Sequence, residues 1–88
     1  MVQGFVYILQ SRKSGQYYIG STMDTQKRLH EHNSGTTIST RNKGPWTIVF
    51  QQQYPSIPQA RKIEQLLKKM KRRDYLEKII RDQVIKMN

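Results

Sequence analysis

The run Phe-Val-Tyr-Ile-Leu-Gln at residues 5–10 is apolar at both alternating sets of positions. Successive side chains of a strand point to opposite faces of a sheet, so a strand of this composition needs cover on both sides. A chain of 88 residues holds one compact domain with a modest core. We therefore predict a single domain over residues 1–88, with this strand at its centre and packed layers on both faces.

Two further segments are predicted as strands. Residues 17–20 follow a polar connection that contains Gly15, which is typical of an antiparallel hairpin with the first strand. Residues 46–50 are rich in β-branched and aromatic side chains and come directly after Pro45. Residues 35–45 show neither the helical nor the strand period of apolar residues, so we predict a loop.

Three segments are predicted as helices, which makes the fold class α+β. The first lies between Gly20 and Gly35, is capped by Thr22 or Asp24 and stops at residues 33–35. Ser56 caps the second helix, whose apolar stripe consists of Ala60, Ile63, Leu67 and Met70. Asp74 and Glu77 form a capping-box-like start for the last helix, whose expected core face is Leu76, Ile79, Ile80, Val84 and Met87.

The charge of the chain constrains its partners. Sixteen Lys and Arg against six Asp and Glu give a formal net charge of +10, which favours binding to nucleic acid. An acidic membrane surface is the rival partner, but no apolar run is long enough to span a bilayer and the start lacks a signal pattern. We expect a cytoplasmic protein, free or associated with the nucleoid. The absence of cysteine excludes disulfides, thiolate zinc sites and a cysteine nucleophile.

Ordered motifs along the chain identify a family. They are Val6-Tyr7-Ile8-Leu9, Tyr17-Tyr18-Ile19-Gly20-Ser21-Thr22, Arg28-Leu29-x-x-His32-Asn33-x-Gly35, Ser39-Thr40-x-x-x-Gly44-Pro45-Trp46 and Ala60-x-x-x-Glu64. In this order the chain resembles the GIY-YIG nuclease superfamily, in particular small stand-alone bacterial proteins related to the nuclease domain of the excision-repair C subunit. The resemblance implies a three-stranded antiparallel sheet flanked by about three helices and divalent-metal-dependent phosphodiester cleavage. The implied catalytic residues are Tyr7, Tyr18, Arg28, His32 and Glu64.

The chain departs from the family pattern at two places. The first motif is Phe5-Val6-Tyr7, so its leading glycine and isoleucine are replaced while the tyrosine remains. Many members also carry an asparagine after the metal-binding glutamate, and here the only one beyond Glu64 is Asn88. That support is either absent or supplied by Asn33 or Asn42.

Each of the five residues suits a step of phosphodiester hydrolysis. A phenol near a metal and an arginine can take a proton from water, and Tyr7 is the first choice for this base. Tyr18 would orient the water or share the proton network, and the sequence leaves open which of the two phenols is the base. The forked guanidinium of Arg28 matches the non-bridging oxygens, and His32 would polarise the leaving oxygen or steady Tyr18. Glu64 is a hard oxygen ligand suited to Mg²⁺ or Mn²⁺.

Structural roles are the alternatives for the same residues. Strand tyrosines usually serve packing, and an Arg28–His32 pair at i,i+4 is by default a solvated helix face on which Glu31 pairs with Arg28 or Lys27. Glu64 can likewise pair with Lys68 at i+4.

Two cationic segments are expected to contact the phosphate backbone, because 10 of the 16 Lys and Arg lie beyond residue 56, against four acids. Trp46 could stack on a nucleotide base, or it could be buried in the core at the start of a strand. The predicted nucleic-acid-binding residues are Thr40, Arg41 and Lys43 in the loop, and Lys68, Lys69, Lys71 and Arg72 on the helices.

The prediction is a DNA endonuclease, structure-selective or weakly selective, linked to repair or recombination. The alternatives are a non-catalytic nucleic-acid-binding module and the catalytic half of a larger assembly. The retained Tyr, Tyr, Arg, Glu set favours the enzyme, since binding alone needs none of it.

Overall fold

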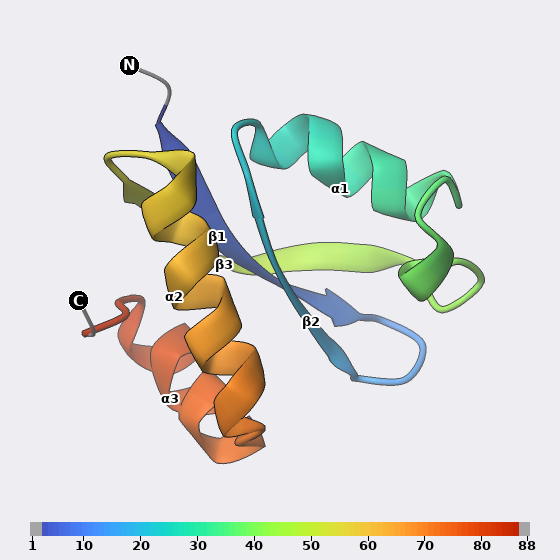
Figure 1. The fold of residues 1–88 in the computed structure, drawn as a ribbon. Coiled ribbons are helices and arrows are strands. Elements are labelled where there is room, and N and C mark those ends of the chain that lie inside the picture. Colours follow the sequence, from blue (N-terminus) through green and yellow to red (C-terminus); the bar gives the residue numbers. More distant parts are fainter. Residues whose placement is uncertain (1–2, 87–88) are drawn as a thin grey trace.

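The computed structural model describes residues 3–86 and contains one antiparallel sheet (Figure 1). Its strands are β1 (Gly4–Ser11), β2 (Tyr17–Thr22) and β3 (Trp46–Tyr54), in the order β2-β1-β3. The predicted central strand is thus confirmed, with the hairpin partner on one side. β3 extends four residues beyond the predicted end at Phe50, because Gln51, Gln52, Gln53 and Tyr54 continue its pairing with β1.

Helices cover both faces of this sheet. α1 (Thr25–Asn33) lies over one face, and α2 (Ile57–Met70) and α3 (Arg73–Asp82) lie over the other (Figure 1). The loop between α1 and β3 contains one short 3₁₀ turn, Ile38–Thr40. Within residues 3–86, none of the helices combines the length and apolar character needed to cross a membrane.

The alternation of β1 divides the core into two halves. Val6 and Ile8 are fully buried against α2 and α3, where Ala60, Ile63 and Leu67 meet them. On the opposite face, Tyr7 and Leu9 pack with Trp46, and with the half-buried Tyr18, Ile48 and Leu29. The two-sided composition of residues 5–10 is therefore explained by these two cores.

Local hydrogen bonds fix the start of two helices as predicted. Asp24 is the N-cap of α1, where its carboxylate accepts from the Lys27 amide at 3.1 Å, so Asp24 and not Thr22 is the cap. The Ser56 hydroxyl accepts from the Gln59 amide at 3.3 Å and caps α2.

The start of α3 was predicted wrongly. Lys71 adopts a left-handed conformation with φ 52°, which ends α2 and turns the chain at once into the next helix. Arg72 is therefore the N-cap and contributes no side-chain cap bond, while Asp74 lies in the first turn and pairs with Arg72 at 2.7 Å.

Two residues predicted to lie in the core are exposed instead of buried, Met70 at 38% and Val84 at 37%. Met70 is the last residue of α2, beyond the sheet contacts, and Gln83 ends α3 in a left-handed conformation that shifts the helical period. Ile85, at 4% exposure, fills the core in place of Val84. Met87 lies outside the described residues.

Candidate active site

A chain of buried hydrogen bonds runs from β1 through α1 to the 3₁₀ turn. The Tyr7 hydroxyl lies 3.0 Å from His32 Nε2, and His32 Nδ1 lies 2.7 Å from the Thr40 hydroxyl. The Thr40 carbonyl accepts from Trp46 Nε1 at 3.2 Å. These side chains are at most 4% exposed, so their geometry is fixed by packing.

The two phenols are diagonal neighbours on one face of the hairpin. Tyr7 is paired with Gly20 and Tyr18 with Leu9, and the tyrosine ring centroids are 6.5 Å apart. A Cβ built at Gly20 would overlap the Tyr7 phenol. Glycine is therefore required opposite Tyr7. The His32 ring packs edge-on against the Tyr18 ring, with the two ring centroids 4.8 Å apart.

Burial controls the protonation of the tyrosine and the histidine. It raises the pKa of Tyr7 to about 12, although Arg28 acts in the opposite direction. Burial, helped by the charge of Arg28, lowers the pKa of His32 to about 4. At neutral pH both groups are uncharged, and a neutral imidazole donates from one nitrogen and accepts at the other. His32 can therefore connect the hydroxyls of Tyr7 and Thr40.

Arg28 is half-buried on α1, and its charge reaches Tyr7 while its guanidinium pairs with Glu31. The Arg28 Nη1 to Glu31 Oε1 distance is 2.8 Å, with both side chains about one-third exposed at 33% and 35%. The structural alternative considered for Arg28 is thus present, together with the predicted proximity to the phenol. His30, also on α1, is exposed.

Glu64 projects from α2 at the β2 edge of the sheet and is only 8% exposed. Its Oε1 accepts from the Ser21 hydroxyl at 2.5 Å, and its Oε2 lies 2.7 Å from Lys68 Nζ. The alternative pairing with Lys68 is therefore realised as well. Burial and the Ser21 bond distinguish Glu64 from an ordinary surface carboxylate.

The carboxylate of Glu64, with the Ser21 hydroxyl beside it, suits a hard divalent cation that takes few protein ligands. Within residues 3–86, no group of three or more His, Cys, Asp or Glu side chains forms a metal cage. A single carboxylate suits Mg²⁺ or Mn²⁺, which retain water and bind substrate phosphate. Glu64 is the residue that would hold such an ion, and the hydroxyl of Ser21 orients its carboxylate.

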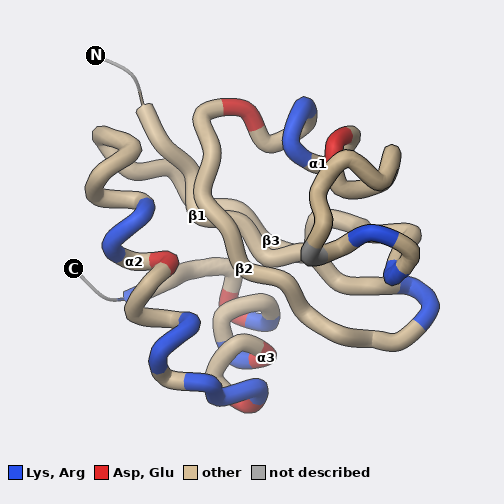
Figure 2. The backbone as a smooth tube through the Cα atoms, turned by 45° about the vertical axis from the view of Figure 1, so that its right-hand side comes forward, with Lys and Arg blue, Asp and Glu red and all other residues tan. Residues whose placement is uncertain are grey.

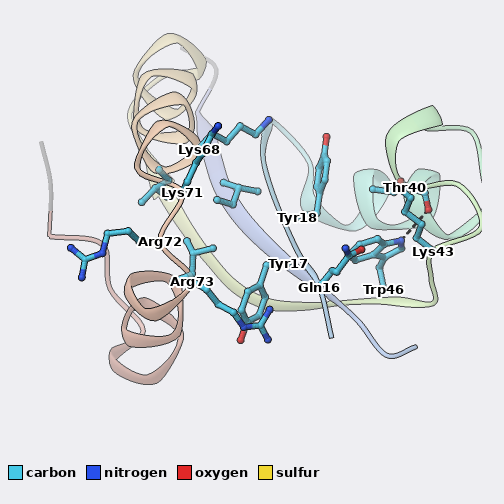
Figure 3. Close-up of a pocket in the computed structure, with 13 residues that line it drawn as sticks. Gln16, Tyr17, Tyr18, Thr40, Lys43, Trp46, Lys68, Lys71, Arg72 and Arg73 are labelled. Atoms are coloured by element: carbon cyan, nitrogen blue, oxygen red, sulfur yellow. Dashed lines mark hydrogen bonds between the residues drawn. The ribbon is translucent and has the colours of Figure 1, made fainter. Parts of the chain in front are cut away.

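A hollow of about 450 Å³ opens beside this site (Figure 3). β2 contributes Tyr17 and Tyr18, the end of α2 and the start of α3 form one wall, and the loop before β3 forms the other (Figure 3). Figure 2 shows Lys and Arg gathered at the junction of α2 and α3 and, across the sheet, on the β1–β2 hairpin and the loop. The lining cations are Lys43, Lys68, Lys71, Arg72 and Arg73.

The six cations among the predicted nucleic-acid-binding residues fall into three groups. Lys43, Lys71 and Arg72 are exposed and line the hollow. Lys69 is exposed outside the lining, and Arg41 is exposed with its Nε bonded to the Gly35 carbonyl at 2.9 Å. Lys68 lines the hollow and at the same time contacts Glu64.

The prediction for Thr40 needs correction, because its side chain is 1% exposed and its hydroxyl is bonded to His32. It positions the imidazole instead of offering a free hydroxyl to a phosphate. Trp46 is 4% exposed and belongs to the core. Asn33 does not replace the missing late asparagine, since its amide is bonded to both the amide and the carbonyl of Trp46 at 2.7 and 3.1 Å.

Three contributors were not anticipated in their structural role. They are Ser21, which holds Glu64, Thr40, which holds His32, and Gly20, which leaves room for Tyr7. The alternation of β2 carries a signal for Ser21, because it places this residue on the face opposite Tyr18, where α2 packs.

Comparisons with known proteins define the class of this site. The family model of the GIY-YIG catalytic domain matches residues 3–78. With the three-stranded sheet and the neighbouring tyrosines, this match shows that the chain belongs to the GIY-YIG family. The nuclease resemblance seen in the sequence motifs is confirmed at the level of the family.

Individual relatives agree with this assignment. A UPF0213 protein of Streptococcus pneumoniae is 39% identical over 71 residues, covering 80% of this chain and 71% of the relative. The solution structure of the UPF0213 protein BH0048 from Bacillus halodurans aligns with a TM-score of 0.56 and 30% identity, covering 92% of this chain and 86% of that one. The human structure-specific endonuclease subunit SLX1 is 35% identical over 49 residues, covering 51% of this chain and 18% of SLX1.

Proposed function

We propose that the protein is a divalent-metal-dependent DNA endonuclease that hydrolyses phosphodiester bonds. The observation that carries this proposal is the meeting of two phenols, an arginine and a buried carboxylate around the edge strand β2, beside a cationic hollow. The membership of the chain in the GIY-YIG family supports the nuclease class.

The residues divide the chemistry between them. Tyr18 lines the hollow, and its proposed role is to orient water against a bound phosphate. Tyr7 is the proposed base: as the phenolate it would accept a proton from the attacking water and become the neutral phenol that hydrogen-bonds to His32 Nε2 at 3.0 Å. Because the pKa of Tyr7 is about 12 in the free protein, this step needs added positive charge near the phenol.

Positive charge comes from two sources. Arg28 offers a bidentate fork to the non-bridging oxygens as charge develops on them. Mg²⁺ or Mn²⁺ held by Glu64 would supply Lewis-acid stabilisation of the same charge. Glu64 is kept in place for this role by its bond to Ser21.

The proposed substrate is DNA with a branched or otherwise irregular structure, in repair or recombination. The human relative is described as a subunit of a structure-specific endonuclease, which supports this choice and the hypothesis of an assembly with a protein partner. The competing function is a non-catalytic nucleic-acid-binding module. The Glu31 pair with Arg28 and the Lys68 pair with Glu64 favour it, since both charged groups of the site have partners in the free protein.

A cleavage panel separates the two functions. Labelled flap, fork, single-stranded and duplex DNA, with an RNA strand of the same sequence, are incubated with the protein in Mg²⁺, in Mn²⁺ and in chelator. We expect metal-dependent cleavage of at least one DNA substrate. Binding of the substrates without cleavage of any of them in either metal would overturn the stand-alone nuclease and favour the binding module.

A further inference from the structure

Lys68 occupies the place beside Glu64 in which a cation is expected. Its Nζ lies 2.7 Å from Glu64 Oε2 and 5.5 Å from the centroid of the Tyr18 ring. The i,i+4 spacing on α2 allows this contact, and the ring face adds a cation–π attraction. Figure 3 shows the Lys68 side chain extended from α2 towards Tyr18.

The carboxylate is the fixed member of this pair and the lysine is the one free to move. The Glu64 side chain is 11% exposed and its second oxygen is bonded to Ser21 at 2.5 Å. The Lys68 side chain is 42% exposed and ends a flexible four-carbon stem. Its ammonium can therefore swing into the hollow while Glu64 stays in place.

A divalent ion and the ammonium compete for the same carboxylate. Two cations on one carboxylate, only a few ångströms apart, repel each other strongly in a partly desolvated site. Metal binding to Glu64 therefore requires Lys68 to leave Oε2. Lys68 lines the same hollow as Lys71 and Arg72, where a phosphate of a bound strand offers the ammonium a new partner.

We infer that Lys68 is a positioning residue that holds the cation place on Glu64 in the free protein and releases it to a substrate phosphate. Metal and nucleic acid then bind cooperatively, and by linkage each raises the affinity of the other by the same factor. This inference rests on the proposed function and adds that DNA regulates metal binding. The Glu64 carboxylate becomes available to the metal when DNA is present.

The test measures the Mn²⁺ affinity of the protein without DNA, from the electron paramagnetic resonance signal of free Mn²⁺. Removing the charge in Lys68→Met or Lys68→Gln should tighten Mn²⁺ binding about tenfold, within the usual range of coupled sites. Lys68→Arg keeps the charge and should stay near wild type. Lys62→Met is the matched control, because Lys62 is exposed on the same helix and none of the ion pairs found within residues 3–86 involves it.

A second titration adds a single-stranded oligonucleotide with phosphorothioate linkages, which resist hydrolysis. The oligonucleotide should raise the Mn²⁺ affinity of the wild type several-fold and that of Lys68→Met much less. If neither neutral variant binds Mn²⁺ more tightly than wild type without DNA, the inference is wrong. That result is independent of the cleavage panel, which alone decides whether the protein is a nuclease.

Discussion

The Tyr7 hydroxyl and His32 Nε2 lie 3.0 Å apart in the protein interior, and both side chains are 2% exposed. The contact joins β1 to α1 across 25 positions of sequence and is continued to the Thr40 hydroxyl. A hydrogen bond in this setting is sensitive to the protonation of its partners, because neither has water as an alternative.

The buried imidazole should make folding stability depend on pH. The pKa of His32 falls from 6.5 to about 4 on folding, so the neutral ring stabilises the folded state above pH 6.5 and this contribution is lost as pH falls towards 4. Between pH 7 and pH 5 the loss should be about 2 kcal/mol in the free energy of unfolding. Urea denaturation at each pH measures it.

Two variants assign the pH effect to one ring. His30→Gln, which removes the exposed histidine, should keep the pH dependence of the wild type. His32→Gln should be less stable at pH 7 and show a flatter profile from pH 7 to pH 5. A wild-type profile in His32→Gln would contradict the assignment.

The two tyrosine hydroxyls should differ in their effect on stability. Tyr7→Phe leaves His32 Nε2 without its buried partner, which should cost about 1–3 kcal/mol of unfolding free energy. Within the described residues no hydrogen bond is found for the Tyr18 hydroxyl, so Tyr18→Phe should cost little. Both variants should lose turnover in single-turnover cleavage at a temperature where each is fully folded. Wild-type cleavage by both would make the phenols part of the scaffold.

Gly20→Ala should disturb the site by crowding. The new Cβ would overlap the Tyr7 phenol, and overpacking of this kind costs about 1–3 kcal/mol. The variant should melt at a lower temperature, and its cleavage rate should fall. Combining it with Tyr7→Phe should recover little stability, because the added Cβ also meets ring carbons of Tyr7. A fully stable, active Gly20→Ala protein would disprove the close approach.

Glu64→Gln should abolish cleavage while keeping the shape of the side chain. Loss of metal stabilisation in the transition state predicts a fall of about a hundredfold or more in rate. DNA affinity should be unchanged or higher, because one negative charge is removed. Glu77→Gln is the control, since this exposed carboxylate pairs with Arg73 on α3 away from the phenols. Near-normal cleavage by Glu64→Gln would remove the metal assignment.

The cationic wall of the hollow should set the salt dependence of DNA binding. Neutralising Lys71 and Arg72 together should weaken binding and lower the log–log salt slope by about one unit per lost phosphate contact. Lys62 and Lys78, both exposed and outside the lining, form the control pair. An unchanged slope in the first double variant would place the DNA elsewhere. Lys68 is kept intact here because of its contact with Glu64.

Much of the fold could be predicted from local sequence patterns. Strand alternation gave the two-sided β1, and the caps Asp24 and Ser56 were found because each bonds to an amide three residues away. The start of α3 was missed because it depends on the left-handed backbone of Lys71, and no residue preference marks a lysine for that conformation. The same applies to Gln83 and the exchange of Val84 for Ile85 in the core.

The site was predictable where it is carried by motifs and not where it depends on long-range contacts. Tyr7, Tyr18 and His32 do come together as the hairpin and the resemblance implied. Of the two partners of Glu64, only Lys68 could be predicted, because it lies one turn away on the same helix. Ser21 could not, because it is 43 residues distant in the sequence. Thr40 looked like a surface hydroxyl, since nothing in its own segment shows that it folds inward.

The phenols and the carboxylate are held by different cores, and this division affects how mutations far from the site act. Tyr7 is fixed by the packing with α1, whereas Glu64 is carried by α2, which is anchored through Ile63 and Leu67 on the other face of the sheet. A cavity under α2 therefore changes the spacing between the two halves of the site without touching the phenols. Substitutions such as Ile63→Val would then misalign Glu64 relative to the phenols. They would leave the spectra of the tyrosine–histidine cluster unchanged but lower the rate of cleavage.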